Sequence, residues 1–170
     1  DTDDSLIVFS VSGSELAITS GGVLTFASAP DYETKSSYSA TVTASDGTNL
    51  STQDITVTIT DVDDVAPAFT SNATFSAAEN QTAIGTVTAT DADTDDSSIV
   101  FSVSGSELSI TSGGVLTFAS APDYETKSSY SATVTASDGT NSSTQDITVN
   151  VTDVNDNSPS ITSSSTFSSD

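Results

Sequence analysis

Apolar and hydroxyl-bearing residues alternate with a period of two along most of this chain. The stretch from Tyr130 to Asp138 places Tyr, Ala, Val and Ala at every second position among Ser and Thr, and Ile147 to Asp153 follows the same pattern. Because successive side chains of a strand point to opposite faces, both stretches predict half-buried β-strands. Asp138-Gly139 lies between them and predicts the turn of a hairpin.

Five further runs of this kind are bounded by turn residues, and none has the 3.6-residue period of a helix. They cover, in chain order, residues 69–76, 82–91, 99–103, 108–110 and 115–118. Seven short β-runs in about 90 residues predict an all-β fold, an antiparallel sandwich of immunoglobulin-like architecture. We expect small Ala, Val and Ile side chains to make a thin core, with its bulk supplied by Phe101, Phe118, Tyr124 and Tyr130.

An internal repeat with a period of 92 residues dominates the chain. Residues 1–61 align with residues 93–153 with five differences. Two of these, Leu6/Ser98 and Leu50/Ser142, exchange an apolar for a polar side chain, so we expect both positions at the surface.

The repeat divides the chain into three segments and suggests a window on a longer tandem array. Residues 1–67 predict a partial repeat without its first two strands, and residues 68–159 a complete repeat. Residues 160–170 predict the first strand of a following repeat. Alone, the partial repeat would expose sheet edges and core, so we expect its strands to come from upstream sequence or from a neighbouring chain.

The charge balance excludes several classes of partner and chemistry. The chain has 24 Asp and Glu residues against two Lys, no His and no Cys, for a net charge of −22. Nucleic acid is excluded as a partner because phosphate binding needs Lys or Arg. No apolar run approaches the roughly 18 residues of a membrane helix, which argues against direct membrane insertion. Without His, Cys or Arg, the usual catalytic bases and thiol nucleophiles are missing, so we expect no enzyme.

The densest acidic runs are two short linkers that close the repeats. Asp61–Pro67 reads DVDDVAP, and Asp153–Pro159 reads DVNDNSP. The strand map places further acids at strand ends, so that eight carboxylates gather around the first linker: Asp31, Glu33, Asp61, Asp63, Asp64, Asp91, Asp93 and Asp138. Ca²⁺ takes six to eight oxygen ligands, whereas Mg²⁺ prefers to keep its waters, so the cluster favours two or three Ca²⁺ ions.

Two other interpretations of these acids are weaker. Scattered acids such as Asp54, Asp96 and Asp146 fit a solvated surface that resists aggregation, but the linker acids recur at matched strand ends. A glycosidase acid/base pair is disfavoured because the acids sit in a linker where nothing could bind a sugar ring.

Five short motifs occur in the order in which cadherin repeats carry them. They are AEN at 78–80, DAD at 91–93, APDYE at 121–125, TASDG at 135–139 and DVNDNSP at 153–159. The chain therefore resembles tandem cadherin repeats over nearly its whole length. The near-identical copies, the lack of Cys and the Ser/Thr/Asp-rich composition look most like bacterial cadherin-like domains of large repetitive surface adhesins. The resemblance implies cadherin-type Greek-key β-sandwiches joined by short calcium-binding linkers.

The resemblance also implies three Ca²⁺ ions at each linker and a set of ligands for them. At the first linker the outermost ion would take Asp31, Glu33 and Asp64, with a base glutamate from outside the chain. The middle ion would take Glu33, Asp61, the Val62 carbonyl, Asp64 and Asp93, and the third Asp63, the Val65 carbonyl, Asp91, Asp93 and Asp138. At the second linker the matching residues are Glu79, Asp123, Glu125, Asp153, Val154, Asn155, Asp156 and Asn157. Asp63 and Val65 depart from the family pattern, which the second linker keeps as Asn155 and Asn157.

These residues predict a calcium-rigidified spacer in an extracellular or cell-surface protein. We expect a structural repeat of an adhesin stalk or fibre, with calcium, the neighbouring repeats and, in a fibre, other copies as its partners. Two alternatives stay open: a polysaccharide-binding module of an extracellular enzyme, and a homophilic cell-adhesion repeat.

Overall fold

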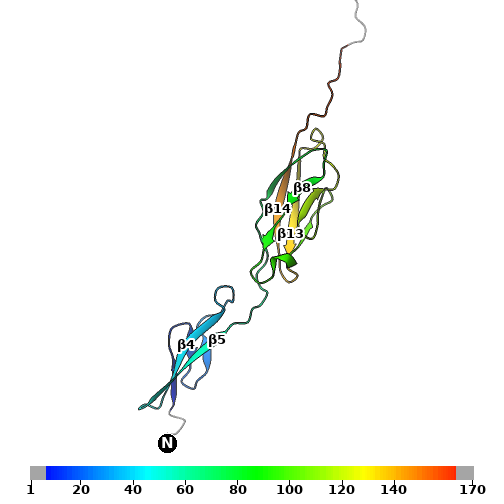
Figure 1. Cartoon of the computed structure of the whole chain (residues 1–170). Coiled ribbons are helices and arrows are strands. Elements are labelled where there is room, and N and C mark those ends of the chain that lie inside the picture. Colours follow the sequence, from blue (N-terminus) through cyan, green and yellow to red (C-terminus); the bar gives the residue numbers. More distant parts are fainter. Residues whose placement is uncertain (1–6, 164–170) are drawn as a thin grey trace, which may run out of the picture. The chain divides into compact units, whose positions relative to one another are not determined.

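The computed structural model describes residues 7–163, and their regular secondary structure is β-strand apart from one 3₁₀ turn at Asp96–Ser98 (Figure 1). The chain clusters into two compact units. Unit 1 is Asp1–Val65 with Ala92–Thr94, and unit 2 is Ala66–Asp91 with Asp95–Asp170. Within the described residues no helix is long and apolar enough to span a membrane. The predicted division into repeats at 67 and 159 stays a prediction, and residues 164–170 of its last segment lie outside the described range.

Unit 2 contains nine strands in three sheets. In chain order they are β6 (Ala68–Phe69), β7 (Thr74–Ala78), β8 (Ala83–Thr86), β9 (Ala89–Thr90), β10 (Val100–Val103), β11 (Leu108–Ile110), β12 (Val115–Phe118), β13 (Ser129–Ser137) and β14 (Ser142–Thr152). A four-stranded sheet has the order β10-β13-β14-β7, a three-stranded sheet the order β11-β12-β8, and β6 pairs with β9. The predicted all-β sandwich fold is confirmed.

Unit 1 repeats part of this arrangement with five described strands. They are β1 (Val8–Val11), β2 (Leu16–Ile18), β3 (Leu24–Phe26), β4 (Ser37–Ser45) and β5 (Leu50–Thr58). One sheet has the order β1-β4-β5 and the other pairs β2 with β3.

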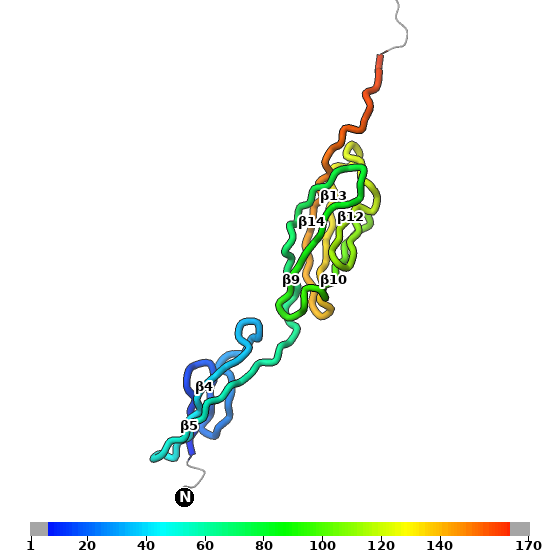
Figure 2. Tube along the Cα trace, in the orientation of Figure 1, coloured from blue at the N-terminus to red at the C-terminus, as the bar shows by residue number. Residues whose placement is uncertain are grey.

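The long hairpin of β13 and β14 forms the centre of unit 2 (Figure 2), and its turn follows from local chemistry. Asp138 accepts hydrogen bonds at Oδ1 from the backbone N–H groups of Thr140 and Asn141, each at 2.6 Å. Gly139 takes a positive φ of 109°, which L side chains rarely adopt. The predicted Asp138-Gly139 turn is confirmed.

Two of the predicted runs are each divided into two strands, and one pairing is parallel rather than antiparallel. The run 69–76 becomes β6 and β7, and the run 82–91 becomes β8 and β9. The cause is a change of partner, because β6 pairs with β9 whereas β7 joins β14 in the four-stranded sheet. The β7–β14 pairing is parallel, with Phe75 opposite Val149.

The β8 edge meets β12 at a close backbone approach. The Val87 N–H donates to the Gly114 carbonyl at 2.8 Å. Gly114 has a φ of +87°, and a Cβ there would lie 2.2 Å from the Val87 carbonyl oxygen. Only glycine fits this position, which explains the Gly113-Gly114 turn that precedes β12.

The core of unit 2 lies between its sheets and agrees largely with the predicted residues. Phe101 and Phe118 are buried, and Tyr130 packs edge-on against Phe118 with ring centroids 5.1 Å apart. The prediction for Tyr124 is wrong, because its side chain is 37% exposed. Tyr124 lies in a loop whose backbone is held by a carboxylate, while its ring stays at the surface.

The near-identical sequences of the two units are buried to different extents. Leu116, Val134 and Val149 are fully buried in unit 2, while their counterparts Leu24, Val42 and Val57 are half-buried. In unit 2, β8 covers the edge of β12 and β7 the edge of β14, and no described strand does this for β3 and β5. Leu50 and its counterpart Ser142 are exposed as predicted, and so is Ser98, while Leu6 lies outside the described residues.

We predict that one substitution has unequal effects in the two units. Leu116→Ala should lower the free energy of unfolding by about 3 kcal/mol, because it leaves a cavity in a closed core. Leu24→Ala should cost about 1 kcal/mol, since its side chain already contacts solvent. Urea unfolding of both variants, followed by circular dichroism, checks this, and equal losses would contradict it.

Candidate metal centre

A buried glutamate lies at one end of unit 2, where three segments meet. Glu79 follows β7 directly, is 3% exposed and is the one charged residue among the buried positions of the described chain. Its Oε2 accepts the Tyr124 N–H at 2.8 Å, and its Oε1 accepts the Val154 N–H at 2.7 Å. Burying a carboxylate is costly unless it is hydrogen-bonded, so these amides hold the charge in place. Glu79 thereby joins the end of β7 to the loop before β13 and to the segment after β14.

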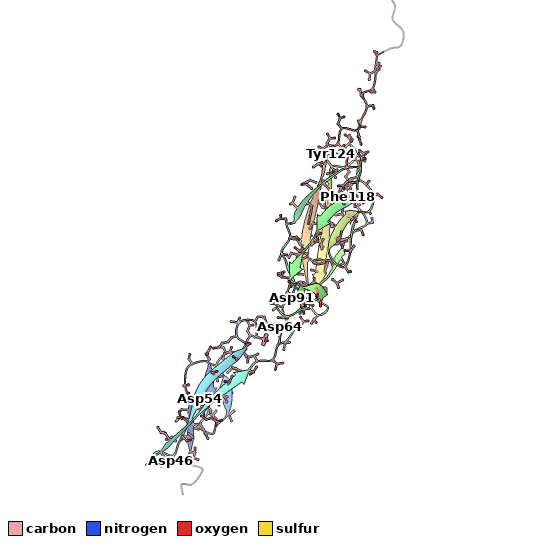
Figure 3. All side chains as sticks on the ribbon, viewed as in Figure 1. Asp46, Asp54, Asp64, Asp91, Phe118 and Tyr124 are labelled. Atoms are coloured by element: carbon pink, nitrogen blue, oxygen red, sulfur yellow. The ribbon has the colours of Figure 1, made fainter. Side chains whose placement is uncertain are left out.

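Two exposed carboxylates complete a cluster around Glu79. One oxygen each of Glu79, Asp123 and Glu125 lies within 4.8 Å of the others. Figure 3 shows Tyr124, the residue between the two exposed acids, at the opposite end of unit 2 from Asp91. This agrees with the prediction that the acids outside the linkers lie at strand ends.

The loop that carries these acids is shaped by its own side chains. Asp123 Oδ1 accepts the Glu125 N–H at 3.1 Å, and Asp123 Oδ2 accepts the Thr126 hydroxyl at 2.8 Å. The Thr126 hydroxyl, followed by the other donors of the turn, lowers the pKa of Asp123. The same bonds recur at Asp31 and Thr34 in unit 1. The APDYE motif therefore builds the same acidic turn twice by an Asx-type local bond.

The two lysines of the chain pair with glutamates outside this carboxylate cluster. Lys127 pairs with Glu107, and its Nζ lies 4.4 Å from the centroid of the Tyr130 ring. Lys35 makes the equivalent contacts with Glu15 and Tyr38. Both cations are thus committed to neighbouring glutamates and aromatic rings.

A second carboxylate cluster lies in unit 1. One oxygen each of Glu33, Asp64 and Asp93 lies within 4.8 Å of the others. Asp93 Oδ2 accepts the Asp64 N–H at 2.8 Å and the Val65 N–H at 2.6 Å, so the first linker is bound through its backbone.

The electrostatics of this cluster reflect mutual repulsion. The Val65 and Asp64 amides lower the pKa of Asp93. The Glu33 backbone amide lowers the pKa of Glu33, but desolvation and the neighbouring Asp93 and Asp31 outweigh it and raise that pKa to about 7. A carboxylate so placed resists ionisation until a cation joins the group.

Unit 2 has a shielded carboxylate oxygen, at Asp138, that is also suited to a cation. Asp138 Oδ2 is shielded from solvent and has no hydrogen-bond partner among the described residues, while its Oδ1 holds the hairpin turn. Buried carboxylate oxygens are normally paired, so this atom is suited to coordinate a metal. Asp91 Oδ2 and Asp93 Oδ1 are also shielded from solvent. Oxygen ligands with no Cys or His fit a hard cation such as Ca²⁺.

The structure brings together some of the predicted site residues and not others. Glu33, Asp64 and Asp93 form one group, and Glu79, Asp123 and Glu125 the other. Seven further predicted acids are not members of these two carboxylate groups: Asp31, Asp61, Asp63, Asp91, Asp138, Asp153 and Asp156. The other predicted ligands carry no carboxylate and lie along the two linkers: Val62, Val65, Val154, Asn155 and Asn157.

Asn80 helps to hold the second linker through a hydrogen bond to Asp156, a role that the sequence did not predict. Its Nδ2 donates to Asp156 Oδ2 at 2.6 Å, and its backbone N–H donates to the Pro122 carbonyl at 3.0 Å. Asn80 has a φ of 64°, a conformation that asparagine tolerates better than most residues. Its place directly after Glu79 in the AEN motif was the available signal.

Comparison with known proteins identifies the fold of unit 2. The family model of the cadherin domain matches residues 73–152. This stretch is recognised as a cadherin domain. The chain is 32% identical over 151 residues to cadherin EGF LAG seven-pass G-type receptor 1 of Mus musculus, covering 82% of the chain and 5% of that protein. It is 34% identical over 152 residues to protocadherin-11 X-linked of Sus scrofa, covering 81% of the chain and 14% of that protein.

Solved cadherin ectodomains have the same architecture. Protocadherin gamma B2 extracellular cadherin domains 3–6 align with a TM-score of 0.75 at 26% identity, over 89% of this chain and 42% of that one. Mouse cadherin-23 EC22–24 aligns with a TM-score of 0.69 at 26% identity, over 89% and 55%. The protocadherin gammaB7 EC3–6 cis-dimer structure aligns with a TM-score of 0.72 at 29% identity, over 88% and 42%.

These matches confirm the cadherin resemblance for residues 73–152. The relatives named above are animal proteins, so they give no support to the narrower resemblance to bacterial adhesins.

We predict that Glu79 stabilises unit 2 even without metal. Glu79→Ala should lower the free energy of unfolding by about 2 kcal/mol or more in EGTA, because it leaves two backbone N–H groups without their acceptor. Urea unfolding provides the measurement. Glu107→Ala, which removes an exposed ion pair, is the control and should change stability by less than about 1 kcal/mol. Similar losses in the two variants would contradict the prediction.

Proposed function

We propose that this chain is a calcium-rigidified structural repeat of an extracellular adhesion protein, with Ca²⁺ bound between successive domains. The observation that carries the proposal is the group of Glu79, Asp123 and Glu125, in which two backbone amides fix a buried carboxylate beside two exposed ones. The two hydrogen bonds to Glu79 hold its carboxylate beside those of Asp123 and Glu125, although like charges repel. Such an arrangement suits a site in which a bound cation offsets the repulsion.

The proposed ligands are the two carboxylate groups and the residues that follow them along each linker. At the first linker they are Asp31, Glu33, Asp61, Val62, Asp63, Asp64, Val65, Asp91, Asp93 and Asp138. At the second they are Glu79, Asp123, Glu125, Asp153, Val154, Asn155, Asp156 and Asn157. Val62, Val65 and Val154 would contribute carbonyl oxygens, as Ca²⁺ sites commonly use. Ca²⁺ would supply the positive charge that these residues lack.

Rigidity follows from the strength of the repulsion that Ca²⁺ removes. The carboxylate oxygens of each group lie within 4.8 Å, which is shorter than the screening length of about 8 Å at physiological ionic strength. Dissolved salt therefore relieves little of the repulsion, and without Ca²⁺ the acids would drive the linker segments apart. Extracellular Ca²⁺ modules bind with Kd of about 10⁻⁴ to 10⁻³ M, so such sites fill outside the cell.

A stalk or fibre is the role that the near-identity of the two copies favours. Residues 1–61 and 93–153 differ at five positions, so the two copies have almost the same sequence over this stretch. Successive recognition domains would be expected to diverge, whereas a spacer gains from repetition. Homophilic adhesion is the second candidate, since a related protocadherin ectodomain was solved as a cis-dimer.

We predict that Ca²⁺ stabilises the protein through Glu125. At tenfold to hundredfold excess over Kd, Ca²⁺ should raise the free energy of unfolding by about 1.4 to 2.7 kcal/mol. Glu125→Gln should reduce this gain and lower the Ca²⁺ affinity at least tenfold, because the site loses a charged ligand.

Isothermal titration calorimetry and urea unfolding with and without Ca²⁺ measure both effects. Asp146→Asn is the matched control: its Oδ1 accepts the Thr133 hydroxyl on the face of the β13–β14 hairpin, away from either cluster. It should bind Ca²⁺ as the wild type does. If the wild type shows neither binding heat nor stabilisation, the calcium proposal fails.

We also predict that Ca²⁺ restricts the motion of the linker. Small-angle X-ray scattering should give a broad distribution of molecular lengths in EGTA and a narrow, more extended one in millimolar Ca²⁺, because bound ions replace repulsion with shared coordination. Mg²⁺ at the same concentration should have a smaller effect. An unchanged length distribution would contradict rigidification of the linker by Ca²⁺, but it would not contradict calcium binding itself.

A further inference from the structure

The loop between β9 and β10 carries four aspartates and closes on itself through one of them. Asp91 follows β9 directly, and the 3₁₀ turn Asp96–Ser98 comes shortly before β10. The backbone N–H of Asp91 donates to Asp96 Oδ1 at 2.8 Å. The sequence places Asp96 among the acids of a solvated surface, and its side chain is indeed exposed. One of its oxygens nevertheless ties the two ends of this loop together.

Local bonds fix the position of Asp96 in turn. Asp95 caps the 3₁₀ turn, because its Oδ1 accepts the Ser97 N–H at 2.9 Å and its carbonyl accepts the Ser98 N–H at 2.8 Å. The Ser97 amide lowers the pKa of Asp95, which favours the charged form of the cap. Ile99 follows the turn, is 5% exposed and packs in the core. The Asp96 side chain therefore starts from a turn that is held on both sides.

Strand register places this turn at the end of unit 2 where Asp138 lies. β10 pairs with β13 so that Val100 is opposite Ser137, and Asp138 comes next along the chain. Because the pair is antiparallel, the residues before Val100 lie at the end where Asp138 turns the β13–β14 hairpin. Figure 3 shows Asp91 at the end of unit 2 opposite Tyr124, a residue that precedes β13. Both acids therefore belong to the same end.

Asp91 and Asp138 are two proposed calcium ligands that differ in what orients them. Each has its Oδ2 shielded from solvent. The Asp138 carboxylate is held directly, by the N–H groups of Thr140 and Asn141. Asp91 is held through its backbone, by the side chain of Asp96. Groups that orient the ligands of a metal tune its affinity, often as strongly as a ligand does.

We propose that Asp96 is a positioning residue of the calcium site at the first linker. Its side chain acts on the Asp91 backbone rather than on the ion, and so sets the direction of the Asp91 carboxylate. The inference rests on the proposed function. Without this bond, repulsion among the aspartates of the loop would favour open conformations. Calcium binding would then have to order the loop again, at a cost in affinity.

The geometry favours positioning over two other roles of the Asp96 side chain. A direct ligand would act through its negative charge, but Oδ1 already accepts the Asp91 N–H, and Asp96 belongs to neither carboxylate group of the described chain. A residue that served only to stabilise its own turn would change the unfolding of the protein and leave its calcium affinity unchanged. The three roles therefore predict different results for the same variants.

Backbone NMR of the full chain during Ca²⁺ titration resolves the two ends of unit 2 residue by residue. The Asp91 and Asn141 amides report on the end that Asp96 supports, and the Tyr124 and Val154 amides report on the Glu79 group. Asp96→Ala should raise the Ca²⁺ concentration at half-saturation about tenfold for the first pair of amides. It should leave the second pair unchanged.

Two further variants separate geometry from charge. Asp96→Asn keeps an oxygen acceptor for the Asp91 N–H, so its half-saturation should stay within about threefold of the wild type. Asp146→Ala is the matched control, because it removes the same charge and one side-chain bond, that from the Thr133 hydroxyl. It should leave both pairs of amides titrating as in the wild type.

Measurements in EGTA test the positioning without metal. The Asp91 amide hydrogen should exchange about threefold to tenfold faster in Asp96→Ala than in the wild type, as the loss of one hydrogen bond predicts. Asp96→Asn should restore the slower exchange. The urea midpoint of Asp96→Ala should change little, because the side chain is exposed.

The other outcomes overturn the inference in distinguishable ways. If Asp96→Asn loses as much affinity as Asp96→Ala, the side chain acts through its charge and the positioning role is wrong. If Asp96→Ala titrates as the wild type does, or if its Asp91 amide exchanges no faster in EGTA, this inference fails while the calcium proposal stands. If the wild type itself does not respond to Ca²⁺, the calcium proposal fails and this inference falls with it.

Discussion

The bond between buried Glu79 and two backbone amides is the constraint on which the functional end of unit 2 depends. A carboxylate with so little exposure is costly to bury without hydrogen bonds, and it accepts them from the backbone N–H groups of Tyr124 and Val154. These residues belong to a loop and to a linker far apart in sequence. By satisfying its own charge, Glu79 fixes the start of the second linker and aligns Asp123 and Glu125 beside it. The calcium hypothesis rests on this preorganisation.

In unit 1 a different carboxylate, that of Asp93, holds the linker backbone. There the half-buried carboxylate of Asp93 accepts hydrogen bonds from the amides of Asp64 and Val65, so the linker is held by a residue that follows it in the chain. In both units a carboxylate orders a linker backbone, and the resulting group of acids carries more negative charge than the protein neutralises. The lysines are placed on Glu15 and Glu107 instead. A cation from the medium is the remaining way to balance the charge.

Comparison of the two copies shows that burial of a strand residue depends on the neighbouring strands as well as on the sequence of its own strand. Val57 and Val149 lie in matching strands with almost the same residues, yet one is half-buried and the other buried. The difference is the strand on the far side, which is β7 for β14 and is not described for β5. The hydrophobic pattern thus predicts which face of a strand is buried. The neighbouring element that covers this face determines how much apolar area is buried, and so how much the burial stabilises the fold.

Period-2 alternation, the Asp-Gly turn and the near-identical repeat were enough to determine the all-β fold and the β13–β14 hairpin, because these depend on local chemistry and on side-chain direction. The cadherin resemblance assigned Glu79, Asp123 and Glu125 to the same linker, and the structure brings one oxygen of each within 4.8 Å of the others. Tertiary structure alone decided that residues 69–76 change sheets, that β7 runs parallel to β14 and that the Tyr124 ring stays exposed. It also decided the Asn80–Asp156 bond and the amides on Glu79. These features depend on which distant backbone groups come within hydrogen-bond distance, and no local pattern in the chain records that.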